Sequence, residues 1–227
     1  MEFNFFLWPM VLPLLIPLFY CIKNKKDTVK DILILILATL LIIIFYWPLT
    51  MTLTSPANIY VKMLLFALIP YTLIIAGHNL RKKPILSKEF GLQKRGLKSS
   101  LKLGIILLPI MLLTTSIIRL YQGIEQNPDV VLAVISFIES FSEEFFFRGL
   151  LFLYLAKKTN LPIAYITSFL SFILMHPQHL NNLFILSTII QAIITLHICQ
   201  KTKNIAGAWL IHGSNRILSI AILPFLF

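Results

Sequence analysis

Long apolar runs limit what this chain can fold into. About eight stretches of roughly 20 apolar residues follow one another, and a helix of that length crosses a hydrocarbon core of about 30 Å. Hydrophobic residues make up 58% of the 227-residue chain, and charged residues only 13%. A soluble domain of this size would not tolerate so apolar a surface. The sequence therefore predicts an all-α, polytopic transmembrane helical bundle.

The predicted spans form a single membrane domain over residues 1–227, without a visible repeat or a soluble domain. Residues 1–129 contain the N-terminal spans, and residues 130–227 contain most of the polar residues that fall inside spans. Chemistry is therefore expected after residue 130. The predicted spans are Phe3 to Ile22, Ile32 to Leu53, Tyr60 to Ala76, Leu101 to Tyr121, Val130 to Ala156, Leu161 to Met175, Leu183 to Cys199 and Ile205 to the C-terminus.

The net charge of +11 is concentrated in alternate connectors between the spans. Lys and Arg mark cytoplasmic loops, so this alternation predicts that both termini lie outside. It also explains the charge without a nucleic-acid partner, and we expect membrane lipids as neighbours instead. A composition rich in Lys, Ile and Asn favours a prokaryotic plasma membrane. The even connectors are almost free of basic residues, and the odd ones carry Lys23, Lys25, Lys26, Lys30, Arg81, Lys82, Lys83, Lys88, Lys94, Arg95, Lys98, Lys157, Lys158, Lys201 and Lys203. The fourth connector carries Glu125 and Asp129 instead.

Charged residues cluster inside the predicted fifth span, where each costs roughly 2.5 to 3.5 kcal/mol to insert. Glu144 and Arg148 are four apart in the favourable acid-first order, so we expect them to pair within the helix. Glu143 has Glu139 one turn before it and gains no such partner. It is therefore the better candidate for a proton acceptor, with Glu144 as its orienting neighbour. Buried ion pairing between helices is the structural alternative.

A histidine ends the predicted sixth span. Pro177 stops that helix, so His176 is expected in its last turn with its ring near free carbonyl groups. Taken alone, such a residue is more often an interfacial histidine than a catalyst. His179 is expected in the following loop, and an exchange of roles between the two histidines stays open.

The last predicted span contains His212 and Asn215, which are three apart and share a helix face. An imidazole beside an amide can activate water and hold a developing oxyanion. The two residues could equally form a hydrogen-bonded pair between helices. Counting residues from the cytoplasmic end places Glu143 about 20 Å deep and His212 about 12 Å deep, so a tilt or kink must close the gap if they share a site.

Taken together, these motifs resemble the CPBP family of intramembrane proteases, which includes CAAX prenyl endopeptidases and the Abi-type bacteriocin-processing and immunity proteins. The resemblance covers roughly residues 130–216. It rests on Glu143-Glu144-x-x-x-Arg148, on Phe172-x-x-x-His176, and on a histidine followed by an asparagine in the final span. The family usually places Asn or Asp four residues after that last histidine, where this chain has Arg216. Asn215 would then have to substitute, or the oxyanion contact is altered.

The resemblance implies hydrolysis of a peptide bond inside the membrane, in a cavity open toward the cytoplasm. Glu143 would activate water, His212 would assist proton transfer, and Glu144 with Arg148 would fix the helix. His176 would orient the water or stabilise the oxyanion. Glu143, His176 and His212 could also hold a zinc ion, as in a metalloprotease.

The substrate stays open at this stage between a prenylated CAAX tail and a peptide or bacteriocin leader. Other intramembrane protease chemistries lack their motifs here, because the sequence has no His-Glu-x-x-His helix and no Gly-x-Ser-x-Gly elbow. Two further functions stay open. One is a non-catalytic immunity or interaction protein, and the other is a transporter or proton relay.

Overall fold

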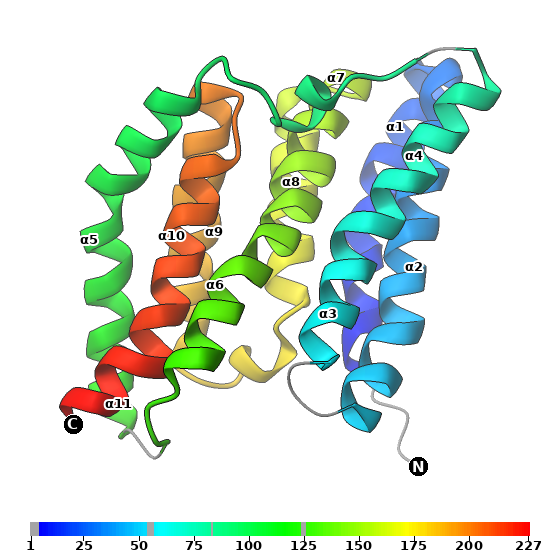
Figure 1. Cartoon of the computed structure of the whole chain (residues 1–227). Coiled ribbons are helices and arrows are strands. Elements are labelled where there is room, and N and C mark those ends of the chain that lie inside the picture. Colours follow the sequence, from blue (N-terminus) through cyan, green and yellow to red (C-terminus); the bar gives the residue numbers. More distant parts are fainter. Residues whose placement is uncertain (1–4, 54–56, 83, 124–125) are drawn as a thin grey trace.

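The computed structural model describes residues 5–53, 57–82, 84–123 and 126–227, and these contain helices but no strand. Phe3, Lys83 and Glu125, which entered the sequence predictions, lie outside the described residues. The helices stand side by side, and the start of η1 and the end of α11 lie at the same end of the bundle (Figure 1). The all-α prediction is confirmed.

Each predicted apolar run corresponds to one helical segment of the structure. Several segments change between α, 3-10 and π geometry along their length, and the labels η mark the 3-10 and π stretches. The elements are η1 (Phe5–Leu14), α1 (Leu15–Asn24), η2 (Lys26–Thr28), α2 (Val29–Thr52), α3 (Ala57–Met63), η3 (Leu64–Leu68), α4 (Ile69–Leu80), η4 (Ser87–Phe90), α5 (Leu97–Gln122), α6 (Val130–Glu144), η5 (Phe145–Tyr154), α7 (Leu155–Lys158), α8 (Leu161–Leu174), η6 (Pro177–His179), α9 (Phe184–Thr202), α10 (Ala206–Ile217), η7 (Leu218–Ile222) and α11 (Leu223–Leu226).

Among the described residues, 6 helices are long and apolar enough to cross a membrane by length and composition. Two predicted spans are not among them. Helix α8 is apolar but only 14 residues long. The continuous helix formed by α6, η5 and α7 contains the charged cluster, which lowers its hydropathy. The prediction of about eight spans therefore holds for the number of helical segments, and six of them have the composition of ordinary spans.

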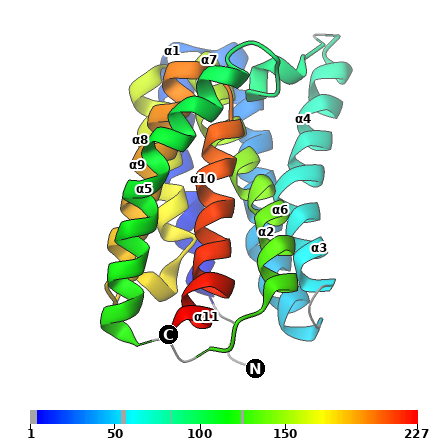
Figure 2. The same ribbon diagram turned by 60° about the vertical axis from the view of Figure 1, so that its left-hand side comes forward.

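This charged helix lies at the centre of the fold. Helix α6 packs against α10 on one side and α3 on the other (Figures 1 and 2). It continues into η5, a π-helix in which every residue is buried. Phe147 packs edge-on against Phe172 of α8, with ring centroids 5.2 Å apart, and Phe146 packs against Phe66 of η3 at 5.6 Å. π-Helical turns are rare and occur often at functional sites, and this one begins directly after Glu144.

Local sequence signals set the helix ends around this centre. The Asp129 side chain accepts a hydrogen bond from Leu132 N at 2.8 Å and caps α6. Asn160 caps α8 in the same way, through Ile163 N at 3.0 Å. These side chains satisfy backbone N–H groups that have no partner in the first turn. Helix α8 ends at Leu174, shortly before Pro177, so His176 lies two residues past the helix and not in its last turn as predicted.

A glycine brings α10 against α5. Gly207 N donates to Ser100 Oγ at 2.9 Å, and a Cβ added at Gly207 would lie 2.0 Å from the carbonyl oxygen of Ser100. Gly104, one turn further along α5, faces the Gly207 backbone. Small residues of this kind allow two membrane helices to approach closely. The contact fixes the height of α10, and with it the height of His212.

Candidate active site

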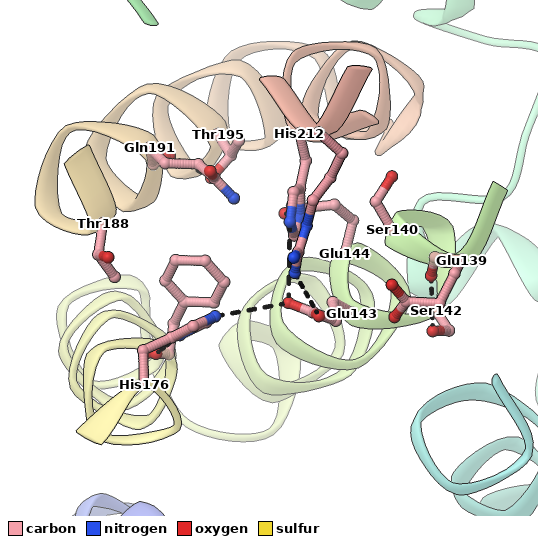
Figure 3. A network of polar contacts seen from close by, with 12 residues as sticks. Glu139, Ser140, Ser142, Glu143, Glu144, His176, Thr188, Gln191, Thr195 and His212 are labelled. Atoms are coloured by element: carbon pink, nitrogen blue, oxygen red, sulfur yellow. Dashed lines mark hydrogen bonds and ion pairs between the residues drawn. The ribbon is translucent and has the colours of Figure 1, made fainter. Parts of the chain in front are cut away.

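The carboxylate of Glu143 lies between His176, just past the end of α8, and His212 of α10 (Figure 3). Its Oε2 atom is 3.9 Å from Nε2 of His176 and 3.9 Å from Nε2 of His212. The side chain of Glu143 is fully buried, and both histidines are nearly so. His176 and His212 are 33 and 69 positions from Glu143 in the sequence, and the fold brings the three residues together. The depth difference expected from residue counting does not separate Glu143 from His212.

Hydrogen bonds orient both imidazole rings. His176 Nδ1 lies 2.9 Å from the carbonyl oxygen of Phe172, and His212 Nδ1 lies 2.9 Å from Oε1 of Glu144. A carbonyl or carboxylate oxygen can only accept, so each Nδ1 carries the proton and donates it. In a neutral ring, Nε2 is then an acceptor. Both Nε2 atoms therefore point an acceptor lone pair toward the Oε2 side of Glu143.

Glu144 and Arg148 form the predicted pair within one helix. Arg148 Nε is 3.2 Å from Oε2 of Glu144, and both side chains are fully buried. Arg148 also donates from Nε to Thr195 Oγ1 of α9 at 2.8 Å, and its guanidinium lies 4.1 Å from the centre of the Phe172 ring. Glu144 thus connects His212 to Arg148, and Arg148 connects the central helix to α8 and α9.

Two cations contact the other oxygen of Glu143, contrary to the expectation that it gains no partner and faces only Glu139. Lys62 Nζ of α3 forms an ion pair with Oε1 of Glu143 and lies 3.0 Å from Oε1 of Glu139. Arg216 Nη2 of α10 lies 3.3 Å from Oε1 of Glu143. The expectation was wrong because it considered only neighbours on the same helix. The two carboxylates share a lysine from a distant span.

Sequence analysis missed Lys62. The residue is a single lysine near the start of an apolar run in the N-terminal half, and chemistry was expected only after residue 130. A signal did exist, because an ionisable residue inside a span is by default a candidate for function. Its side chain is only 12% exposed in the structure. The division of the chain at residue 129 stays a prediction, and the N-terminal spans do contribute to the candidate site.

Asn215 and Arg216 both lie along the wall of one polar cavity with His176 and His212. The volume of this cavity is about 300 Å³. The buried Oδ1 atom of Asn215 has no hydrogen-bond partner among the described residues. The rotation of about 100° between neighbouring helix positions does not turn either side chain out of the cavity. Both Asn215 and Arg216 can therefore contact a bound substrate.

His179 lies beside His176 and away from Glu143. Its ring stacks on that of His176, with centroids 5.2 Å apart, and its Nδ1 is 2.7 Å from Thr188 Oγ1 of α9. It lines the cavity from the 3-10 turn η6, which agrees with the predicted loop position. The structure thus places His176, and not His179, next to the carboxylate.

An apolar groove lies on another face of α6. Its volume is about 470 Å³, and it lies between α6 and the helix that runs from α3 to α4. Phe141, Ser142 and Phe145 line one side of it, and Tyr60 and Leu64 line the other. Its lining is almost entirely hydrocarbon and aromatic, which suits contact with lipid chains.

The residues expected for zinc do not fit that ion here. The described residues include no group of three or more His, Cys, Asp or Glu side chains arranged to hold a metal ion. Lys62 and Arg216 already compensate the charge of Glu143, and both lie against its Oε1 atom. A divalent cation would be added to a buried site in which Lys62 and Arg216 already balance the carboxylates of Glu139 and Glu143, which is electrostatically unfavourable.

The comparison with protein families agrees with this geometry. Residues 125–218 match the family model described as type II CAAX prenyl endopeptidase Rce1-like. The C-terminal part of the chain is thus similar to CAAX proteases of this family. The matched region begins just before α6 and ends at the start of η7, so it contains Glu143, His176 and His212. Lys62 lies outside it.

This match supports a multi-pass membrane protein and a hydrolase of the CAAX-type intramembrane protease class, with a peptide as substrate and lipid around it. Searches of curated proteins and of solved structures each return no match. The roles of individual residues must therefore be argued from the geometry of the site itself.

Proposed function

We propose that this protein is an intramembrane endopeptidase in which Glu143 activates a water molecule to hydrolyse a peptide bond. The family match supports the class of enzyme, and the geometry around Glu143 supports the mechanism. The substrate is a membrane-associated peptide segment that reaches the polar cavity. A prenylated tail and a peptide leader are both substrates of this kind, and the location of the cavity bears on the choice between them.

The observation that carries the proposal is the position of Oε2 of Glu143. This buried atom has no hydrogen-bond partner among the described residues, and it lies 3.9 Å from each of two histidine Nε2 atoms. These distances are too long for direct hydrogen bonds and suit a bridging water. A water between these atoms can donate one proton to Glu143 Oε2 and the other to one of the histidine Nε2 atoms, and the donation to the carboxylate is the arrangement needed to remove that proton.

In the proposed reaction, Glu143 Oε2 takes a proton from the water while the water oxygen attacks the substrate carbonyl carbon. The carbonyl π electrons move to its oxygen, which becomes an oxyanion. Asn215, through its amide N–H₂, and Arg216 are the donors of the cavity wall that can stabilise this charge. Collapse of the intermediate breaks the C–N bond, and the proton held by Glu143 passes to the leaving amine, with His212 assisting the transfer.

The cations on Oε1 have a matching role in this proposal. Lys62 and Arg216 both bind Oε1 and leave Oε2 toward the histidines. They orient the carboxylate and compensate its charge in a buried environment. Glu144 and Arg148 act indirectly. Glu144 keeps the proton of His212 on Nδ1, and Arg148 holds Glu144 in place.

The same contacts favour a second candidate function, that of a non-catalytic immunity or interaction protein. A carboxylate with two cations on it can be a purely structural ion-pair network between α3, α6 and α10. Arg216 also occupies the position where the resemblance implies Asn or Asp. In this alternative the network holds the bundle together, and its charge-neutral variants lose stability without losing a chemical activity.

Cleavage by purified protein in detergent tests the two candidates. The substrates are a mixed peptide library that includes farnesylated CAAX peptides, and the variant is Glu143→Gln. We expect cleavage by the wild type and a loss of about 10²- to 10⁴-fold in kcat for Glu143→Gln, the range for removal of a general base. A chelator should leave the wild-type rate unchanged.

Glu89→Gln is the matched control, because it changes a glutamate that pairs with Lys157 outside the cavity. It should keep wild-type activity. Full activity of Glu143→Gln would contradict the mechanism. Absence of cleavage by a folded wild-type protein, with Glu143→Gln folding equally well, would favour the non-catalytic alternative. Loss of activity with the chelator, restored by added zinc, would contradict the conclusion that these residues do not fit a zinc ion.

A further inference from the structure

The polar cavity lies in one half of the bundle, at the end where both termini are found. Thr115 and Arg119 line it from the last turns of α5, and Ser187 lines it from the first turn of α9. Ser219 lines it from η7, near the end of the chain. Helix α5 ends, α9 begins and the C-terminal helix ends at the same end of the bundle (Figures 1 and 2).

The connectors at this end hold no basic residue. Residues 53–56, 123–129 and 175–183 contain neither Lys nor Arg, and the same is true of both terminal segments, 1–6 and 223–227. The loop 175–183 contributes His176 and His179 to the cavity wall. The end of the bundle at which the cavity is found is therefore the end without positive connectors.

The opposite end carries the basic connectors. The segments between α1 and α2, between α4 and α5, between α7 and α8, and between α9 and α10 all lie there (Figure 1). Lys25, Arg81, Lys94, Lys158 and Lys203 are examples from these four segments. Short loops rich in Lys and Arg remain in the cytoplasm, and acidic residues such as Asp31 contribute little to this preference.

Between the cavity and the basic end, the centre of the bundle is packed with hydrocarbon and aromatic side chains. All residues of η5, from Phe145 to Tyr154, are buried. Arg148 is the charged residue of this stretch, and it is bound by Glu144 and Thr195. Among the described residues, three cations line the cavity, and all lie inside helices and not in connectors. Lys62 and Arg216 are paired with Glu143, and the guanidinium of Arg119 lies 5.1 Å from the centre of the Phe184 ring. They do not reverse the orientation argument, because the basic residues of the connectors far outnumber them.

From this arrangement we infer that the cavity opens toward the extracytoplasmic face, so the substrate is a peptide segment presented outside the cytoplasm. This inference rests on the proposed protease function for its chemistry. It selects an exported peptide, or the outer juxtamembrane segment of a membrane protein, over a cytoplasmic prenylated tail. It differs from the expectation of a cavity open toward the cytoplasm, because the cavity and the two termini lie at the same end of this fold.

Cysteine labelling in intact cells tests the orientation without relying on activity. Asn181→Cys places a thiol at an exposed position in the cavity-side loop, and Ser99→Cys places one at an exposed position in the first turn of α5 at the basic end. The native Cys21 and Cys199 are both buried, and the unsubstituted chain serves as the background control. The probe is a membrane-impermeant maleimide.

We expect Asn181→Cys to be labelled in intact cells and Ser99→Cys only after the membrane is permeabilised. The reverse pattern would overturn the inference, and so would labelling of both variants in intact cells. Failure of the proposed function is seen separately, in the detergent cleavage assay, where orientation has no effect. A cleaved peptide and a reversed labelling pattern would leave the protease in place and return the substrate to the cytoplasmic side.

Discussion

Glu143 has two chemically different sides. Its Oε1 atom contacts Lys62 and Arg216, and its Oε2 atom faces the Nε2 atoms of His176 and His212. A buried carboxylate without compensation would be costly, and the two cations provide that compensation on the side away from the histidines. Because the two oxygens differ in this way, the proposal that Glu143 acts as a general base explains its surroundings better than an ion pair alone.

Lys62→Met should lower kcat by about 100-fold, because loss of the cation frees Glu143 Oε1 and lets the carboxylate rotate out of position. KM should change little, and Lys62→Arg should restore much of the rate. Steady-state kinetics on a cleaved peptide measures both constants. Lys157→Met is the control, because Lys157 is half-exposed and pairs with Glu89 outside the cavity. Wild-type kcat in Lys62→Met would remove Lys62 from the site.

At the scale of elements, the central helix is held to its neighbours by a buried ion pair and by close glycine contacts. Arg148 joins η5 to α9 through Thr195, and Gly207 lets α10 approach α5. The first contact sets the rotation of the helix that carries Glu143, and the second sets the height of His212. The site therefore depends on contacts that lie a full turn or more away from it.

Arg148→Met should destabilise the protein by about 3–5 kcal/mol, since it leaves Glu144 buried with an uncompensated charge. The double variant Glu144→Gln with Arg148→Met removes both charges and should recover part of that loss. Thermal unfolding in detergent, followed by circular dichroism, gives the comparison. Equal stability of the single and double variants would show that the pair contributes no coupling.

Gly207→Ala should destabilise the α5–α10 contact by about 1–3 kcal/mol, because the new Cβ would meet the Ser100 backbone, which cannot move aside like a side chain. Gly104→Ala is the matched control. A Cβ there would lie 3.0 Å from the nearest Gly207 atoms, so a smaller loss is expected. The same unfolding measurement applies, and a larger loss for Gly104→Ala would contradict the assigned contact.

At the scale of the whole molecule, the ends of the bundle differ in charge and in access. The basic connectors gather at one end, while the cavity and both termini lie at the other (Figure 1). Sealed membrane vesicles make this asymmetry measurable. A membrane-impermeant peptide substrate should be cleaved by right-side-out vesicles directly, and by inverted vesicles only after detergent is added. Direct cleavage by inverted vesicles would place the cavity on the cytoplasmic face.

The fold and part of the site were predictable because they depend on local properties of the chain. Apolar run length predicted the helical segments, and the four-residue spacing of Glu144 and Arg148 predicted their ion pair, which the structure confirms. The turn at Pro177 likewise predicted the ring of His176 close to a carbonyl group, which the structure confirms, although His176 lies just past the end of α8. Each of these depends on residues that lie within one helix or next to its end.

The sequence by itself therefore determined that this is a helical membrane protein, which residues are charged inside it, and which end of each helix is basic. Only the tertiary structure decided that Lys62 and Arg216 contact Glu143, that its other oxygen faces two histidines, and that the cavity lies at the end opposite the basic connectors. The physical reason is that hydropathy and helical periodicity act along one segment. The rotation and height at which helices pack depend on contacts between segments far apart in the chain, such as Gly207 with Ser100.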